Sequence, residues 1–220
     1  MILYNLPYFK EKEFPVLLDF MKQHPFVVLC GADANKEPVA TQVPVLFDMR
    51  DEQLFLTGHM MRQTDHHKAF VSNPEALVLF TGPHTYVSAS WYTDPHQGST
   101  WNYMTVHARG RLQFLPESRL RVLLERTTAL FENNDQSPSL FGQLPPAYVN
   151  RLIPAITAFE IAVQSIENVF KLSQNRDEES YINIIGKLMG GNEDAQVIAT
   201  EMKKRQAALY ANNSFQNDET

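Results

Sequence analysis

The sequence predicts a mainly β fold with flanking helices (α+β), in which a mostly antiparallel sheet closes into a barrel. About six β-rich runs follow one another through short connections, and helical segments stand between and after them without alternating with every strand. A parallel sheet would require a full crossover between successive strands. We expect a single domain over residues 1–209 and a polar tail, residues 210–220, which is disordered because it has no apolar support.

The first third of the chain is expected to contain one docking helix and then strands. Phe14, Leu17 and Met21 recur at helical spacing and predict a helix over residues 11–24. The period then changes to that of strands. Pro44 lies inside one of these runs and marks an edge or a bulge. We expect strands over residues 25–32, 39–48, 53–59 and 75–83, with a short helix over 61–73.

The remainder carries two long β-rich runs, a well-defined helix and a helical end. The runs 84–92 and 101–115 flank a polar loop, and the second run is long enough to bend at Gly110. Residues 116–132 begin with Pro and Glu and space their leucines helically, which predicts a helix. Further along we expect a polar Pro-bearing stretch (133–146), a short helix (147–153), a pair of strands (156–175) and a helical region (177–209).

Composition and charge narrow the classes of function. Of the 220 residues 44% are hydrophobic and 20% charged, which is typical of a globular protein, and the net charge of −6 opposes binding of a phosphate backbone over the whole surface. With neither an 18-residue apolar run nor a signal-peptide pattern, we expect a cytoplasmic protein that does not enter the membrane. The sequence contains no Gly-rich phosphate loop, zinc-type Cys pair or recognisable nucleophile elbow, so no metal is expected and the catalytic residues are unknown.

The first candidate site is the segment LTGHMMRQTDHHKAF, where a strand end meets a helix start. An arginine, hydroxyls and imidazoles beside the unpaired N–H groups of a first helical turn make a cradle for an anion such as a phosphate. The candidate residues are Thr57, Gly58, His59, Arg62 and Lys68. The alternative is a solvated basic helix face with one capping interaction.

The second candidate contains both tryptophans of the chain, on either side of the loop TDPHQGS. Trp91, Tyr92 and Trp101 could wall a flat aromatic ligand, because ring faces stack well and their polar edges stay available. The alternative is that these aromatic residues belong to the core or to a subunit interface and happen to bracket a turn.

The third candidate is the late run VFKLSQNR. Lys171, Ser173 and Gln174 form part of a dense polar stretch directly after a strand, and such groups can hydrogen-bond a polar ring edge or a phosphate. The alternative is an exposed strand leading into a helix that is capped by Asn175 or Asp177.

The succession GHMMR, FTGPHTYVSASWY, TWNYMTVHARG and KLSQNR closely resembles the PaiB family of FMN-binding split-barrel proteins, described as negative transcriptional regulators. The resemblance covers nearly the whole chain. It implies a split β-barrel with C-terminal helices that binds FMN at a homodimer interface. It also implies that the residues of all three candidate sites contact the cofactor. The sequence departs from the family pattern at residues 63–67 (QTDHH), in the loop DPHQGS and at Phe170, where a tryptophan is usual.

Three functions remain open. The first is an FMN-binding negative transcriptional regulator, for which direct DNA contact is uncertain because the chain is acidic and shows no basic helix-turn-helix. The second is an FMN-dependent oxidoreductase acting on a small molecule. The third is a flavin-free dimeric interaction module.

Overall fold

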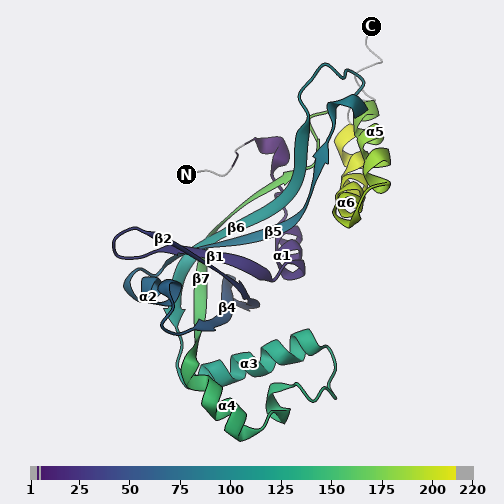
Figure 1. Ribbon diagram of the computed structural model, residues 1–220. Helices are drawn as coiled ribbons and strands as arrows, with labels where there is room; N and C mark the ends of the chain where they lie inside the picture. Colours follow the sequence, from purple (N-terminus) through teal and green to yellow (C-terminus); the bar gives the residue numbers. More distant parts are fainter. Residues whose placement is uncertain (1–3, 5, 212–220) are drawn as a thin grey trace. The chain divides into compact units, whose positions relative to one another are not determined.

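The computed structural model describes residue 4 and residues 6–211 of the chain (Figure 1). Six α-helices and seven strands are seen in this part. The helices are α1 (Phe14–Gln23), α2 (Asp65–Ser72), α3 (Glu117–Glu132), α4 (Pro146–Leu152), α5 (Glu178–Met189) and α6 (Glu193–Tyr210). The strands are β1 (Phe26–Ala32), β2 (Pro38–Pro44), β3 (Leu46–Arg50), β4 (Gln53–Met61), β5 (Glu75–Val87), β6 (Thr100–Phe114) and β7 (Ile156–Lys171).

The strands form one sheet in the order β2-β1-β5-β6-β7-β4-β3. The pairs β1–β2, β1–β5, β3–β4 and β4–β7 are antiparallel. Thr57 of β4 lies opposite Glu160 of β7 on one side and opposite Leu46 of β3 on the other. This arrangement agrees with the mainly antiparallel sheet that the sequence predicts.

Three predicted strand boundaries differ from the structure. The run 39–48 is divided into β2 and β3 around Pro44, in keeping with the expected interruption. The run 75–83 and the first part of the run 84–92 form the single strand β5, which ends at Val87, and residues 89–91 form a 3₁₀ turn. Pro83 does not end β5, because β1 pairs with it only over Leu77–Leu79. Likewise, residues 156–171 form one strand where a pair was expected.

Two glycines mark close approaches inside the sheet. A Cβ built on Gly82 would lie 2.6 Å from the ring of Phe20, so this glycine makes room for an aromatic side chain and does not form a turn. A Cβ on Gly110 would lie 2.2 Å from the backbone oxygen of Ala162. Both positions therefore exclude larger residues by packing, not by an unusual backbone angle.

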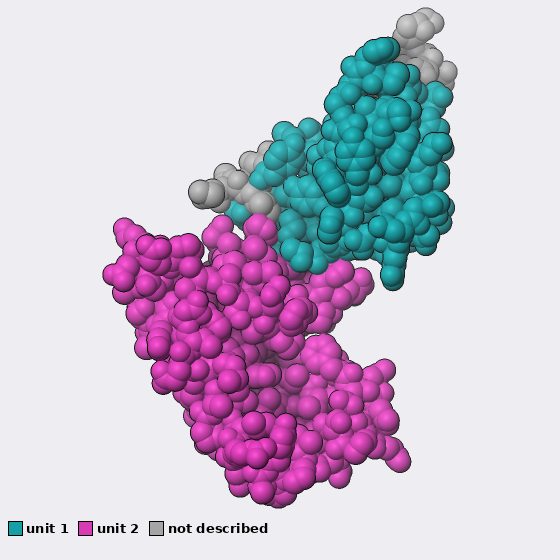
Figure 2. All heavy atoms as spheres, viewed as in Figure 1, with its two compact units in different colours: residues 1–20, 81–106, 167–220 teal, residues 21–80, 107–166 magenta. Residues whose placement is uncertain are grey.

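The chain divides into two compact units (Figure 2). Unit 1 comprises residues 1–20, 81–106 and 167–220, and unit 2 comprises residues 21–80 and 107–166. The single domain expected over residues 1–209 stays a prediction. Of the predicted tail, Tyr210 ends α6, and residues 212–220 lie outside the described residues.

Each unit has its own apolar packing. In unit 2, α3 and α4 cover one face of the sheet through a cluster of buried side chains: Leu46, Leu120, Leu123, Val149, Ile153 and Ala158. In unit 1, α5 and α6 pack on each other, and Tyr181 is fully buried between them with its hydroxyl donating to the backbone oxygen of Met202 at 3.0 Å. Within the described residues, no helix combines the length and apolar character needed to cross a membrane.

Candidate functional site

Strand β4 presents the first candidate residues on opposite faces of the sheet, because side chains alternate along a strand. Gly58 lies on one face, where a Cβ would meet the ring of Phe159 at 2.6 Å. Thr57 and His59 lie on the other face. The Thr57 side chain is only 5% exposed, and its Oγ1 has no hydrogen-bond partner among the described residues. The structure therefore does not aim these three residues at one point.

His59 is the partly buried histidine of this strand and lies opposite Ala158 of β7. Burial lowers its pKa, because a low-polarity surrounding penalises the charged imidazolium. The ring is therefore held in the neutral form around neutral pH, in which one nitrogen donates a hydrogen bond and the other accepts one.

Arg62 follows β4 and is exposed to solvent. Its backbone N–H donates to the oxygen of Ala155 at 2.8 Å, and its Nε donates to the oxygen of Ile156 at 2.9 Å. These bonds fix the base of the side chain against the start of β7. The guanidinium still has further N–H groups that can point at a ligand.

The N-terminus of α2 is closed by the side chains of the chain itself. Thr64 is the N-cap, and its Oγ1 accepts from the backbone N–H of His67 at 3.3 Å. The Asp65 carboxylate accepts from the backbone N–H of His66 at 2.7 Å, and this bond lowers the pKa of Asp65. An anion at this place would accordingly be bound by side chains and not by the backbone of the first turn.

Basic side chains surround His67. Its ring lies 4.9 Å from that of Phe114, and its Nδ1 is buried with no hydrogen-bond partner in the described part of the chain. Burial lowers the pKa of His67, and the positive charges of Arg62, His66 and Lys68 lower it further. The structure thus places Arg62 and Lys68 around an imidazole that was not among the candidate residues. We call Arg62, His66, His67 and Lys68 the basic cluster; its positive potential and its donors fit a phosphate group.

The late polar residues lie in unit 1 and are bonded within it. Lys171 donates through Nζ to Thr100 Oγ1, and its pKa is lowered by burial and by the charge of Arg176. Ser173 is 2% exposed and donates to Asn102 Oδ1 at 3.0 Å. Their hydrogen bonds join the end of β7 to the start of β6.

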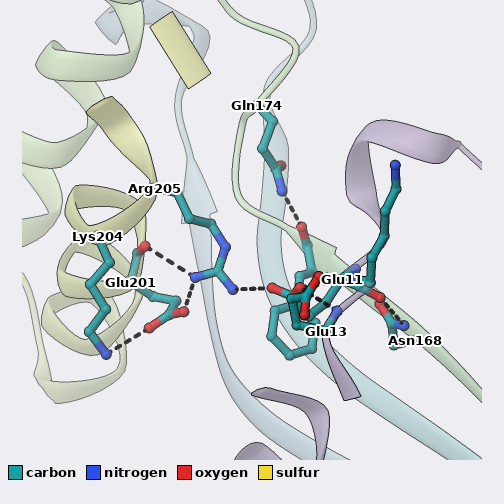
Figure 3. Close-up of polar contacts among 9 residues, drawn as sticks. Glu11, Glu13, Asn168, Gln174, Glu201, Lys204 and Arg205 are labelled. Carbon is teal, nitrogen blue, oxygen red and sulfur yellow. Dashed lines mark hydrogen bonds and ion pairs between the residues drawn. The ribbon is translucent and has the colours of Figure 1, made fainter. Parts of the chain in front are cut away.

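Gln174 stabilises the turn after β7. Its Oε1 accepts from the backbone N–H of Leu172 at 2.7 Å. Its Nε2 donates to the backbone oxygen of Phe170, which is the dashed line drawn from Gln174 in Figure 3. Ser173, inside this turn, has the positive φ of 63°. The amide of Gln174 is therefore engaged in local structure.

The same figure shows an ionic network beside this turn. Arg205 of α6 lies between Glu201 of the same helix and Glu11, whose Oε2 it contacts at 2.9 Å (Figure 3). Its guanidinium carbon also lies 5.4 Å from the ring centroid of Phe170. The side chain of Asn168 bonds both backbone groups of Glu11. This network ties the segment before α1 to β7 and α6.

The two tryptophans occupy different surroundings. Trp91 ends a short 3₁₀ turn (Ala89–Trp91) and is half-buried. Trp101 on β6 is 53% exposed, with the rings of His84 and Tyr86 at 6.0 and 5.9 Å. These three side chains make an exposed aromatic face on β5 and β6.

Tyr92 and the first residue of the loop 93–99 contact the start of α5 and the residues just before it. The ring of Tyr92 is buried, its hydroxyl has no partner among the residues described, and Arg176 lies over it. The backbone N–H of Thr93 donates to Ser180 Oγ at 2.9 Å. Asp177, expected as a possible cap, is the N-cap of α5 and accepts from the N–H of Ser180. The loop is thus held by side-chain contacts at its first residues.

A hollow that the sequence did not indicate lies between β4 and α3. It has a volume of about 100 Å³, and the Thr57 side chain lines it together with Leu115, Arg119, Val122, Leu123 and Arg126. The arginines come from a helix whose pattern predicts only packing, so no sequence signal connected them with Thr57. Across residues 4 and 6–211, no group of three His, Cys, Asp or Glu side chains is placed to hold a metal ion.

Comparison with known proteins identifies the family. Residues 3–165 match the family model described as "Putative FMN-binding domain". The "Protease synthase and sporulation protein PAI 2" of Bacillus subtilis is 31% identical over 204 residues, which cover 92% of this chain and 98% of that protein.

Solved structures give the fold. The FAD and heme binding protein of Mycobacterium smegmatis is similar with a TM-score of 0.54 and 16% identity, covering 73% of this chain and 72% of that one. A conserved hypothetical protein of Mycobacterium tuberculosis gives the same TM-score with 10% identity, covering 76% and 90%. The predicted α+β fold, with a mostly antiparallel sheet of the split-barrel type, is confirmed.

Proposed function

The chain belongs to the PaiB family of proteins with an FMN-binding domain, and from this premise we propose that it binds FMN with the phosphate at the basic cluster of unit 2. The observation that carries the proposal is that Arg62, His66 and Lys68 surround His67, whose buried Nδ1 has no hydrogen-bond partner among the described residues. The pKa of His67 is lowered first by burial and then by the charges of these three side chains. A phosphate dianion neutralises this charge and accepts hydrogen bonds from the same side chains.

The residues of this chain would contribute binding and orientation, and the flavin, when bound, would supply hydride or electron transfer. Arg62 offers guanidinium N–H groups beyond the Nε that bonds the backbone oxygen of Ile156. Lys68 is exposed and offers an ammonium group. His67 offers its ring nitrogen that lacks a partner among the described residues.

The other candidate residues remain proposed flavin contacts. Trp101 presents an exposed ring on which a flat aromatic system can stack. For the late polar residues, contact with a flavin requires exchange of the internal bonds that they make now. The proposed contacts outside the basic cluster are Thr57, Gly58, His59, Trp91, Tyr92, Trp101, Lys171, Ser173 and Gln174.

A comparison of FMN with riboflavin tests the phosphate site directly, because the two ligands differ only in the phosphate. Titrations followed by visible absorption and quenching of flavin fluorescence give both affinities. We expect the wild-type protein to prefer FMN, and Arg62→Ala and Lys68→Ala each to weaken FMN binding about tenfold, the loss of roughly 1.4 kcal/mol, while riboflavin binding changes little. Arg121→Ala, at a partly exposed arginine of α3 that pairs with Glu117 outside the basic cluster, is the matched control.

Two results would contradict the proposal. Equal affinities for FMN and riboflavin, or no effect of Arg62→Ala, would place the phosphate elsewhere. No binding of either flavin would leave the third function, the flavin-free dimeric module.

For the cellular role we propose a cytoplasmic homodimer that acts as an FMN-binding negative regulator of transcription. The relationship to the B. subtilis protein, whose name refers to a protease synthase and to sporulation, favours this role over the oxidoreductase alternative. The charge of −6 predicts that any direct DNA contact is local. Light scattering tests the dimer, and salt-dependent promoter binding tests the regulator. Turnover of NADH or NADPH with an electron acceptor would favour the oxidoreductase.

A further inference from the structure

A larger hollow of unit 2 lies beside β3. Its volume is about 470 Å³, within the range of roughly 300–1,000 Å³ that is typical of ligand sites. The end of α1, the residue before β1, the segment around the start of β3 and one side of α3 line it. The lining residues are Lys22, Pro25, Val45, Leu46, Phe47, Arg126, Ala129 and Leu130. All of them belong to unit 2, and we call this space the edge hollow.

The side chains of Leu46 and Phe47 show that the edge hollow runs along a side of β3. Neighbouring residues of a strand point to opposite faces of the sheet. Leu46 belongs to the buried cluster with α3 and α4, whereas the ring of Phe47 lies 5.9 Å from that of Phe80. A space that both residues line therefore lies at an edge of the strand. One edge of β3 pairs with β4, and no other strand of the described residues pairs with the opposite edge.

The backbone of Phe47 faces this free edge. The hairpin of β3 and β4 has a two-residue turn, residues 51 and 52, whose φ angles are 49° and 64°. In such a turn the flanking residues, Arg50 and Gln53, form a hydrogen-bonded pair. Bonded and non-bonded pairs alternate along antiparallel strands, so Phe47 is at a non-bonded position opposite Leu56. Its N–H and C=O groups consequently point away from β4.

A hydrogen bond of Val45 agrees with this orientation. The backbone N–H of Val45 donates to the oxygen of Pro25 at 2.9 Å, and both residues line the edge hollow. N–H groups two residues apart in an extended chain point to the same side. Phe47 therefore offers one donor and one acceptor to the edge hollow, in the arrangement that a neighbouring strand requires.

The edge hollow carries one positive charge that lacks a partner in the described part of the chain. Arg126 is paired with Asp48 through hydrogen bonds of 2.7 and 3.0 Å. Lys22, in the last turn of α1, is exposed and has no ion pair or hydrogen bond with a described residue. Leu130, at 56% exposure, adds apolar surface. An acidic group beside an apolar group is the complement of this lining.

We propose that the edge hollow binds a short extended peptide, which pairs with the free edge of β3 as a further strand. One peptide residue accepts from the N–H of Phe47 and donates to its oxygen, an apolar side chain contacts Leu130, and an acidic side chain pairs with Lys22. A peptide fits better than a fatty acid, because its backbone supplies both a donor and an acceptor. The residues of the basic cluster do not line the edge hollow, so the inference goes beyond the proposed flavin function.

The probe is a capped tripeptide of leucine, alanine and glutamate, in that order, added to the full chain. Amide hydrogen exchange and chemical shifts are followed by NMR. In the free protein the Phe47 amide should exchange faster than those of Leu46 and Asp48, which are at positions bonded to β4. Saturating peptide should slow the exchange of Phe47 roughly tenfold, with shifts along β3.

Modified ligands separate the backbone contact from the apolar contact. N-methylation of the alanine removes the N–H that Phe47 accepts and should weaken binding about tenfold. Decanoate, which has an acidic group and an apolar chain but no amide, should bind more weakly than the tripeptide. Equal binding of the N-methylated peptide, or tighter binding of decanoate, would show an amphipathic anion without strand pairing and would overturn the proposal.

Lys22→Gln tests the charge. This variant should bind the tripeptide about threefold more weakly, as expected for an exposed ion pair, and should no longer prefer it to the peptide with lysine in place of glutamate. Lys187→Gln, at an exposed lysine in the last turn of α5, is the matched control and should bind as the wild type does. An unchanged preference in Lys22→Gln would contradict the proposed pairing.

Two further outcomes would overturn the proposal. The first is the absence of saturable binding at millimolar tripeptide. The second is slow exchange of Phe47 in the free protein that becomes fast on dilution, because a second copy of the chain would then cover the edge. FMN titrations of the same samples keep the two functions apart: failure of FMN to bind, with tripeptide binding intact, would contradict only the proposed flavin function.

Discussion

The guanidinium carbon of Arg176 lies 4.1 Å from the centroid of the Tyr92 ring. The Arg176 side chain also donates through Nη1 to the amide oxygen of Gln97. The backbone N–H of Arg176 donates to the backbone oxygen of Ser173 at 3.0 Å. One residue thus connects the turn after β7 with the loop between the two tryptophans.

Removal of this side chain should release the loop. Arg176→Ala removes a cation–π contact and a hydrogen bond, together about 1–2 kcal/mol. Amide hydrogen exchange in residues 93–99 should accelerate about tenfold, measured by mass spectrometry. The control is Asn175→Ala, an exposed neighbour. Unchanged exchange would show that the contacts of Thr93 with Asp177 and Ser180 hold the loop alone.

Two buried tyrosines should respond oppositely to loss of their hydroxyl groups. Tyr181 donates to the backbone oxygen of Met202, so Tyr181→Phe should lower the free energy of unfolding by about 1 kcal/mol. The Tyr92 hydroxyl has no partner among the described residues, so Tyr92→Phe should leave stability equal or higher. Urea denaturation measures both. Equal losses would contradict the assignment, and weaker FMN binding in Tyr92→Phe alone would identify the flavin as the missing partner.

The Glu11–Arg205 pair should contribute to the stability of unit 1. Both side chains are largely buried, at 16% and 20% exposure, and loss of one partner leaves a desolvated charge. Because Glu201 still accompanies Arg205, Glu11→Gln should cost only about 1–2 kcal/mol. Glu13→Gln, an exposed neighbour, should cost little. A denaturation midpoint that does not differ between the two variants would contradict this view.

Stability should fall as the pH decreases from 7.5 to 5.5. The pKa of His59 is lower in the folded chain than its ordinary value of 6.5. The unfolded chain therefore takes up its proton first on acidification, and stability is lost as the pH falls through about 6.5. His24 and His67 have lowered pKa values and act in the same direction.

The variant His59→Gln should flatten part of this dependence, while His96→Gln at an exposed loop position should not. Free energies of unfolding from urea titrations at each pH provide the measurement. A slope unchanged by His59→Gln would mean that this ring is protonated equally in both states.

The local elements could be predicted where short-range pattern decides them. Residues 116–132 carry helical leucine spacing and a Pro–Glu start, and α3 forms over Glu117–Glu132 with Pro116 as its N-cap. The merger of residues 75–87 into one strand could not be predicted, because Gly82 and Pro83 resemble a turn locally. Gly82 packs against the ring of Phe20, and Pro83 lies outside the segment of β5 that pairs with β1. Both facts depend on residues distant in sequence.

The candidate site could likewise be predicted only where it depends on residues close together in the sequence. The spacing of Arg62 and Lys68 around one strand–helix junction is local, and the structure brings both near His67. That Thr57 and Arg119 line one hollow was not predictable, because it depends on which face of β4 is covered by α3. Trp91 and Trp101 are only ten residues apart, but Trp91 is half-buried in a 3₁₀ turn and Trp101 is exposed on a strand.

The strands β5, β6 and β7 each run through both compact units, since the boundaries at residues 80/81, 106/107 and 166/167 fall inside them. With a fourth crossing inside α1, neither unit is a continuous piece of the gene product. No single truncation or proteolytic cut yields one unit intact, and recombination at one crossover cannot exchange a unit between relatives. A substitution that alters one unit must therefore leave the shared strands able to form the other unit. The same condition applies to a ligand site that evolves or is engineered in one unit.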